Sequence, residues 1–222
     1  MRRLFIHIPK NAGMSIRHAH LPGVEVAGEG KHITPDYTEV VRVHMKANNE
    51  HHGFEHARWR DVRADLKRLP AFAVVRNPWA RVASRYFFGK QVAKQGKPES
   101  QNYTFRTFDE FLDERHRWGE EPYYWHRAVR GWYQQLDYVT DEAGEVRCTV
   151  LRCERLARDL RLLTGFALPP RRRNVTEHGF PYQGFYSFPQ RRVVADWYAR
   201  DIEAFGFSFE SAATRNVLCQ DG

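Results

Sequence analysis

The sequence lacks long hydrophobic runs and contains only 3 cysteines among 222 residues. It nowhere has the roughly 18 consecutive apolar residues of a transmembrane helix. The apolar run near its start, about four residues, is shorter than the roughly 7–15 of a signal peptide. The cysteines are odd in number and lack metal-ligand spacing, so they predict neither a disulfide framework nor a zinc site. We therefore expect a cytoplasmic protein with reduced thiols and no transmembrane segment.

Positive charge, in contrast, is plentiful. A formal net charge of +8 indicates an anionic partner, which could be nucleic acid, a membrane surface, an acidic polymer or a polyphosphorylated small molecule. A merely basic surface would give the same total. With 42% hydrophobic and 14% aromatic residues the chain can bury one good core, and its length fits a single domain spanning residues 1–222.

Short apolar runs that suit buried strands alternate with segments of helical spacing. This alternation predicts an α/β domain with a central, mainly parallel sheet flanked by helices. Strands are expected at residues 4–8, 71–75, 136–139 and 146–151. Helices are expected at residues 15–21, 57–69, 78–94, 108–118, 154–164 and 189–205, with an aromatic helical stretch at 123–136 and a weaker helical pattern after Pro35.

Several helix ends are marked by local signals. Asn77 is a good N-cap and precedes Pro78, a residue favoured at the first helical position. Thr107 and Glu110 have the spacing of a capping box, and Gly165 is expected to end the helix before it.

The stretch FIHIPKNAGMSI, residues 5–16, places a short loop between a buried strand and a helix. Such a loop collects free backbone N–H groups and is a natural anion site. Lys10 adds a positive charge there, and Gly13 allows a close approach of the backbone. The order of residues is not that of a Walker A motif, in which the lysine directly precedes Ser or Thr. Taken alone, the loop is equally compatible with a plain structural turn.

The strand AFAVV ends at Arg76, where a nucleoside triphosphatase would carry a Walker B carboxylate for magnesium. An arginine at the carboxyl edge of a parallel sheet points into the ligand crevice and can bind a phosphate bidentately without a metal. The ligand is therefore expected to carry a phosphate in addition to the group held by the Lys10 loop. A magnesium-dependent nucleotide kinase becomes the less favoured alternative.

Taken together, HIPKNAGMS and VVRNPWARVASRY resemble the two cofactor motifs of the sulfotransferases that use 3′-phosphoadenosine 5′-phosphosulfate (PAPS), in the carbohydrate sulfotransferase-like branch. The similarity extends through TVLRCERLARDL, RNVT and YARDIEAFGF and so covers residues 4–207. It implies a P-loop-like three-layer fold. It also implies that Arg76 and Ser84 bind the 3′-phosphate of PAPS. The 5′-phosphosulfate would be bound by the first loop, namely Lys10, Asn11, Ala12, Gly13, Met14 and Ser15.

This sequence departs from the family pattern at two loop positions. Asn11 and Met14 stand where the family usually has threonines, so two hydroxyl contacts to the phosphosulfate are missing and backbone amides, Lys10 and Ser15 must carry more of the binding. The second motif is intact. Cofactor binding is therefore better supported than turnover.

Two residues are the candidates for catalysis. Lys10 is expected to stabilise charge on the oxygen between the sulfate and the departing adenosine bisphosphate, although a solvated lysine is the plain alternative. His32, within GKHITPDYTEV, resembles the family histidine between the two motifs and is our candidate for the base that deprotonates the acceptor. A solvated loop histidine is the alternative there. His44 is a lesser candidate, and His7, within the first strand, suits a structural role.

Three further groups of residues allow both a functional and a structural interpretation. Arg173, next to Arg171 and Arg172, is expected over the 3′-phosphate, but the three arginines also suit a solvated loop or a contact with an acidic acceptor. The aromatic stretch 123–133 favours core packing over stacking on a sugar. Histidines 51, 52 and 56 favour a polar loop over a zinc site, because no cysteine or carboxylate stands at metal spacing.

The sequence thus predicts a PAPS-dependent sulfotransferase that transfers a sulfuryl group to a hydroxyl of a glycan or small molecule by in-line displacement, without a metal. Besides the kinase, two alternatives remain. A sulfotransferase relative could bind PAPS or its product without transfer, given Asn11 and Met14. A nucleic-acid-binding module would instead interleave basic and aromatic residues along one face, whereas the arginines here cluster in phosphate-loop motifs. We therefore expect no nucleic-acid partner.

Overall fold

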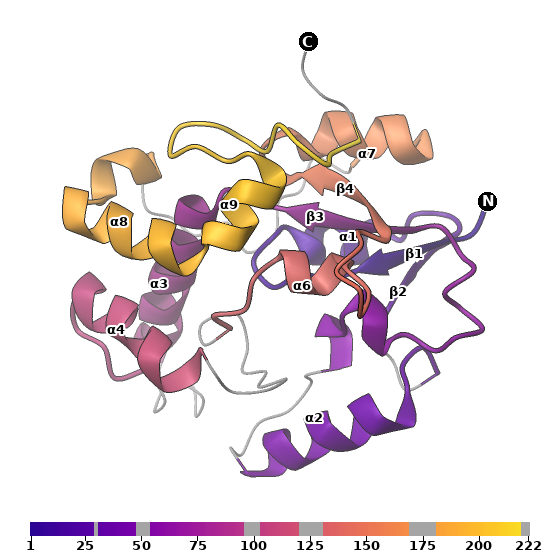
Figure 1. Ribbon diagram of the computed structural model, residues 1–222, viewed down its shortest axis with the longest axis horizontal. Coiled ribbons are helices and arrows are strands. Elements are labelled where there is room, and N and C mark those ends of the chain that lie inside the picture. Colours follow the sequence, from indigo (N-terminus) through magenta and orange to yellow (C-terminus); the bar gives the residue numbers. More distant parts are fainter. Residues whose placement is uncertain (29–30, 48–53, 96–102, 120–130, 169–180, 219–222) are drawn as a thin grey trace.

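The computed structural model describes residues 1–28, 31–47, 54–95, 103–119, 131–168 and 181–218. Its centre is a four-stranded sheet in the order β2-β1-β3-β4, and all neighbouring strands are parallel. The strands are β1 (Arg3–Ile6), β2 (Val24–Val26), β3 (Ala71–Val75) and β4 (Cys148–Arg152). The predicted α/β class, with a mainly parallel sheet flanked by helices, is confirmed (Figure 1).

Alternate strand residues point to opposite faces of the sheet, so each face has its own hydrophobic core. Leu4 and Ile6 belong to a large core on one face, whereas Phe5 and Leu151 belong to a smaller core on the other. The large core includes residues of α3 (Pro78–Lys94), α4 (Phe108–Trp118), α8 (Phe188–Trp197) and α9 (Ala199–Phe205). The small core includes residues of α1 (Gly13–Ala19) and α7 (Leu156–Thr164).

Helix α2 (Pro35–Ala47) lies apart from the sheet, at the lower edge of the molecule in Figure 1. Its buried face, which includes Tyr37 and Val41, packs with Ile33 and Ala57 in a third, separate cluster. The weak helical pattern after Pro35 is thus confirmed.

The predicted cap residues are confirmed, although only half of the capping box at Thr107 and Glu110 forms. Asn77 Oδ1 accepts the N–H groups of Trp79 and Ala80 at the start of α3. Thr107 Oγ1 accepts the N–H of Glu110 and begins α4, while the Glu110 carboxylate accepts the N–H of Arg106. Gly165, with φ 78°, ends α7.

The helix predicted at residues 57–69 is wrong. The chain there makes a short 3₁₀ turn, η2 (Trp59–Asp61), followed by irregular turns. Asp61 accepts the N–H and guanidinium groups of Arg58, and Val62 forms a β-bridge with Ile33. These contacts satisfy the backbone outside a helix, and Leu66 reaches the core from the turns that follow.

The strand predicted at residues 136–139 is also wrong, because the structure has a helical turn, α6 (Leu136–Val139). Asp201 of α9 accepts the N–H groups of Gln135 and Leu136 and so caps this turn. The predicted final helix divides at Tyr198 into α8 and α9. Residues 131–134 are not helical, and the earlier part of the aromatic stretch lies outside the described residues.

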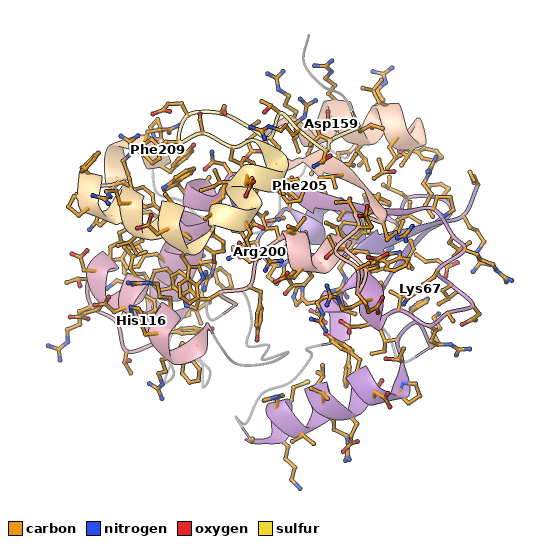
Figure 2. All side chains as sticks on the ribbon, viewed as in Figure 1. Lys67, His116, Asp159, Arg200, Phe205 and Phe209 are labelled. Carbon is orange, nitrogen blue, oxygen red and sulfur yellow. The ribbon has the colours of Figure 1, made fainter. Side chains whose placement is uncertain are left out.

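Two ion pairs connect helices to neighbouring elements, one of them buried and the other exposed. Asp159 of α7, labelled in Figure 2, pairs with Arg152 at the end of β4, and both side chains are fully buried. Arg200 reaches from α9 to Asp137 of α6, with Nη2 2.9 Å from Oδ1. Within the described ranges, no helix has the length and apolar character needed to cross a membrane.

Candidate functional site

The two motifs meet where the chain connections of neighbouring strands diverge. Strands β1 and β3 are adjacent and parallel, but β1 leads to α1 on one face of the sheet and β3 leads to α3 on the other. In open parallel sheets, ligands bind outside the carboxyl ends of strands at such a switch point. The Lys10 loop and Arg76 follow these two strand ends, and Arg76 Nη1 donates to the Lys10 carbonyl oxygen at 3.2 Å.

The loop after β1 has an unusual backbone. Lys10 and Ala12 have φ values of 65° and 61°, in the left-handed region that residues with a side chain seldom occupy. Alternation of left- and right-handed residues turns successive N–H groups toward one concave side. The N–H groups of Ala12, Gly13 and Met14 donate to no acceptor among the residues the structure describes. They are therefore free to bind an anion.

Gly13 is required by a close approach within the protein itself. A Cβ atom at this position would lie 1.8 Å from the ring of His7. Any larger residue would displace either His7 or the start of α1. The glycine of the motif therefore makes room for a buried histidine beneath the loop.

Lys10 carries a charge that the protein does not neutralise. Its Nζ lies 4.0 Å from the centroid of the Phe88 ring, and it forms no ion pair with any carboxylate that the structure places. Burial, together with the positive charges of Arg76 and Arg85, lowers the pKa of Lys10 to about 7. A bound anion would offset both effects and favour the protonated form.

The arginines of the second motif add to this positive charge. Arg81 is fully buried; its Nε donates to the Pro9 carbonyl and its Nη1 to the Tyr133 carbonyl, while Nη2 has no partner in the described part of the chain. Arg76 is half-buried and, within the same ranges, donates from its side chain only to Lys10. Ser84 is buried one helical turn beyond Arg81. We call Lys10, Arg76 and Arg81 together the cationic cluster.

The side chain of Asn11 faces inward. It is 1% exposed, and its Nδ2 donates to the Val74 carbonyl and to Gln135 Oε1 at 2.8 and 2.6 Å. Its amide nitrogen thus holds the loop against β3. Met14 and Ser15 lie half-buried in the first turn of α1, where Ser15 N–H donates to the Ala12 carbonyl.

His32 lies in a different place. It is 5% exposed, and its Nε2 is 3.3 Å from Glu25 Oε2 of the edge strand β2. It lines a pocket of about 520 Å³ whose other walls are Arg2, Arg17, Glu25, Val26, Lys31 and Leu66. The structure thus brings Lys10, Arg76 and Arg81 together, whereas His32 contacts β2. The role of His32 as the catalytic base stays a prediction.

His7 and His56 form a buried pair, so the polar loop predicted for His56 is wrong. The rings of His7 and His56 lie 4.3 Å apart, and His56 Nδ1 is 2.8 Å from the His7 carbonyl oxygen. Burial lowers the pKa of His7 well below its ordinary value and that of His56 to about 3. His44 lies in the last turn of α2.

Several predicted residues fall outside the described ranges. These are Arg173 with its neighbours Arg171 and Arg172, His51, His52 and the aromatic residues before position 131. At the described end of the aromatic stretch, Trp132 is 2% exposed and belongs to the large core, in accord with the core-packing interpretation.

Two residues at the site carried no signal that sequence reasoning recognised. Gln135 contacts both motifs and follows a stretch that had been assigned to the core. Glu154 accepts the N–H of Asn77 at 2.8 Å, and its position just after β4 places it at the carboxyl edge of the sheet. The strand-end position could have identified Glu154; nothing local identifies Gln135.

Comparisons of the chain with models of known protein families, with curated proteins and with solved structures found no match.

Proposed function

We propose that this protein is a PAPS-dependent sulfotransferase with a P-loop-like site. The observation that carries the proposal is the cationic cluster of Lys10, Arg76 and Arg81 at the switch point between β1 and β3, where no described carboxylate forms an ion pair with any of them. The carboxylates of Asp201 and Glu154 act on Arg81 and Arg76 from a greater distance. Clustered, partly desolvated cations repel one another and are stabilised by an anion placed among them. The free N–H groups of the Lys10 loop provide further donors to such an anion.

Two features favour a ligand with two anionic groups over a nucleoside triphosphate with magnesium. The backbone donors and Lys10 follow β1, whereas the remaining guanidinium N–H groups of Arg76 and the buried Ser84 follow β3. A cation also occupies the strand end at which a kinase or ATPase would carry its metal-binding carboxylate. PAPS has a phosphosulfate and a separate 3′-phosphate, and the sequence resemblance selects it among doubly anionic nucleotides.

The reaction would be an in-line displacement at sulfur. The acceptor hydroxyl oxygen, on a glycan or small molecule, would form a bond to sulfur while the bond from sulfur to the phosphate oxygen breaks and adenosine 3′,5′-bisphosphate leaves. Lys10 and the loop amides would stabilise the charge that develops on the leaving oxygen. The hydroxyl proton would pass to a base, for which His32 is the candidate.

A second candidate function is binding of the cofactor or its product without transfer. The inward position of the Asn11 side chain favours it, because the amide nitrogen is occupied by Val74 and Gln135 and is not free for the phosphosulfate. The two functions share the cationic cluster and differ in turnover. Formation of adenosine 3′,5′-bisphosphate from PAPS in the presence of hydroxyl acceptors distinguishes them.

The first test is calorimetry without magnesium. Wild type, Arg76→Ala and Arg68→Ala are titrated with adenosine 3′,5′-bisphosphate and with adenosine 5′-monophosphate. Arg68 is exposed before β3, at the opposite end of that strand from Arg76, so its variant makes the same change of charge away from the site. We expect wild type and Arg68→Ala to prefer the bisphosphate, and Arg76→Ala to lose about 10-fold or more in affinity for it, since a hydrogen bond to a charged group contributes about 1.5–3 kcal/mol. Equally weak binding of both nucleotides to wild type would refute the proposal.

A further inference from the structure

The side-chain amide of Gln135 is buried between the two phosphate-binding segments. It accepts the N–H of Arg76 at 2.8 Å and donates to the Arg76 carbonyl at 2.9 Å. Its Oε1 also accepts Nδ2 of Asn11 at 2.6 Å. Gln135 is fully buried, so these groups have no access to water. The amide therefore pairs with both backbone groups of the first residue after β3, as a neighbouring strand would.

Gln135 is itself held in place by α9. Asp201 Oδ2 accepts both the backbone N–H of Gln135, at 2.8 Å, and its Nε2, at 3.2 Å. Asp201 is also fully buried. The oxygen and the nitrogen of the Gln135 amide are both used in hydrogen bonds, although Oδ1 of Asn11 has no partner among the described residues. A flip of the glutamine amide would leave these buried donors and acceptors unpaired, so the amide is fixed in one orientation.

The residue two positions earlier reinforces this connection. The Tyr133 carbonyl accepts Nη1 of Arg81, whose Nε donates to the Pro9 carbonyl. Segment 133–135 is thus joined to the loop after β1 through Asn11 and Pro9, and to the second motif through Arg76 and Arg81. It lies 124 positions from Asn11 in the sequence and supplies a common support for both motifs.

We infer that Gln135 is a positioning residue of the cationic site, which holds the Arg76 backbone and the Asn11 loop side by side in the arrangement that presents both to a doubly anionic nucleotide. The inference rests on the proposed function. Gln135 acts through Arg76 and needs no contact with the ligand, because its amide is used entirely by protein groups. Without Gln135, the backbone N–H and carbonyl of Arg76 lose their hydrogen-bond partners. The guanidinium group then no longer extends toward a phosphate from a fixed backbone position.

Gln135→Met keeps the length of the side chain and removes its hydrogen bonds. The matched control is Gln134→Met, since Gln134 is the neighbouring glutamine, half-buried, and its Nε2 donates to the Trp197 carbonyl, away from Arg76. Both variants should lower Tm. At a temperature at which all proteins are folded, we expect Gln135→Met to weaken binding of adenosine 3′,5′-bisphosphate about 10-fold or more, and Gln134→Met to change it less than about 3-fold.

A double-mutant cycle separates positioning from general destabilisation. In the Arg76→Ala background, Gln135→Met should cost less affinity than it costs in the wild type, because only the contact with the Asn11 loop then remains to be lost. If Gln135→Met does not fold, Gln135→Glu replaces it; it keeps an acceptor for Asn11 but cannot donate to the Arg76 carbonyl when ionised. Equal losses in the position 134 and position 135 variants, or additive losses in the cycle, would overturn the inference alone. Failure of wild type to prefer the bisphosphate would overturn the proposed function and this inference with it.

Discussion

The ammonium group of Lys10 lies over the Phe88 ring and in the field of Arg76 and Arg85, and its pKa falls from the ordinary 10.5 to about 7. Between these two values the unfolded chain binds this proton more tightly than the folded protein does. The unfavourable contribution of the buried Lys10 charge to the free energy of folding is therefore largest below about pH 7 and disappears as the pH rises toward 10.5. In the ligand-free protein, a protonated Lys10 therefore lowers the stability of the folded state.

Replacing Lys10 with methionine should therefore stabilise the ligand-free protein. We expect Lys10→Met to raise Tm by about 2–4 °C or more at pH 6 to 7, and the gain to shrink as the pH approaches 10. The same variant should bind adenosine 3′,5′-bisphosphate at least about 10-fold more weakly. Differential scanning calorimetry from pH 6 to pH 10 and titration calorimetry measure the two effects.

Lys67→Met is the control for this experiment. Lys67, labelled in Figure 2, also lies over an aromatic ring, 4.6 Å from the centroid of Trp59, but its Nζ donates to the Arg60 carbonyl. Its replacement should not raise Tm. A Lys10→Met protein that is less stable than wild type at pH 6 would contradict the view that this charge is uncompensated.

The junction of α6 and α9 depends on one carboxylate. Asp201 accepts the N–H groups of Gln135 and Leu136 and so forms a helical turn from a segment whose own sequence favours a strand. Burial raises the pKa of Asp201 from 3.8 to about 6, although the N–H donors favour the ionised form. Two elements that are far apart in the chain are thus joined by a group that titrates near neutrality.

Asp201→Asn should destabilise the protein by about 1–3 kcal/mol, because the added NH₂ group faces N–H donors and cannot accept from them. In the wild type, the folded state holds the Asp201 proton more tightly than the unfolded chain. The contribution of Asp201 to the free energy of unfolding therefore falls as the pH rises from about 4 to about 6 and is constant above pH 6. The advantage of wild type over the variant should shrink across that window. Urea denaturation at several pH values measures it.

The nearby Asp137→Asn variant provides the comparison. Asp137 pairs with Arg200 across the same junction, but this ion pair is exposed and should contribute only about 0–1 kcal/mol. If both variants lose the same small amount, Asp201 does not organise α6.

The elements that sequence predicted correctly are those whose signals are local. Strand β3 and helix α3 have the expected bounds because an apolar run and an Asn-Pro cap lie within a few residues of the ends that they define. Segment 136–139 was assigned wrongly because Asp201, 65 positions from Leu136, decides its conformation. The helix predicted at 57–69 was wrong for the same kind of reason. Contacts between Arg58 and Asp61 form a short turn there, and hydrophobic periodicity gives no information on such contacts.

The same distinction applies to the site. The placement of Lys10 and Arg76 at one edge of the sheet follows from two parallel strands and their following loops, so it could be predicted from the sequence. Their direct hydrogen bond was not predicted. The support from Gln135 could not be predicted, because a glutamine that bonds to Asn11 across 124 positions has no local pattern. The inward orientation of the Asn11 side chain depends on Gln135 and could not be predicted from the sequence either.

At the scale of the whole molecule, positively charged residues gather at the candidate site. The chain has a formal net charge of +8, and the cationic cluster gathers three basic residues at the carboxyl ends of β1 and β3, with no described carboxylate in an ion pair with them. Self-repulsion of this kind destabilises a compact state. A ligand that neutralises the cluster should therefore stabilise both faces of the sheet together, since β1 and β3 contribute to each core.

Adenosine 3′,5′-bisphosphate should consequently raise the Tm of the entire chain. At 100 times the Kd, ligand that binds only the folded state contributes about 2.7 kcal/mol, which corresponds to about 5–10 °C at this chain length. Sodium chloride of equal ionic strength should produce a smaller shift, because screening reduces the repulsion without forming the hydrogen bonds of a phosphate to Arg76 and the loop. Thermal unfolding of wild type and Arg76→Ala measures both. A shift that persists in Arg76→Ala, or that chloride reproduces, would mean that general screening of the basic surface stabilises the protein and that no nucleotide is held at the cluster.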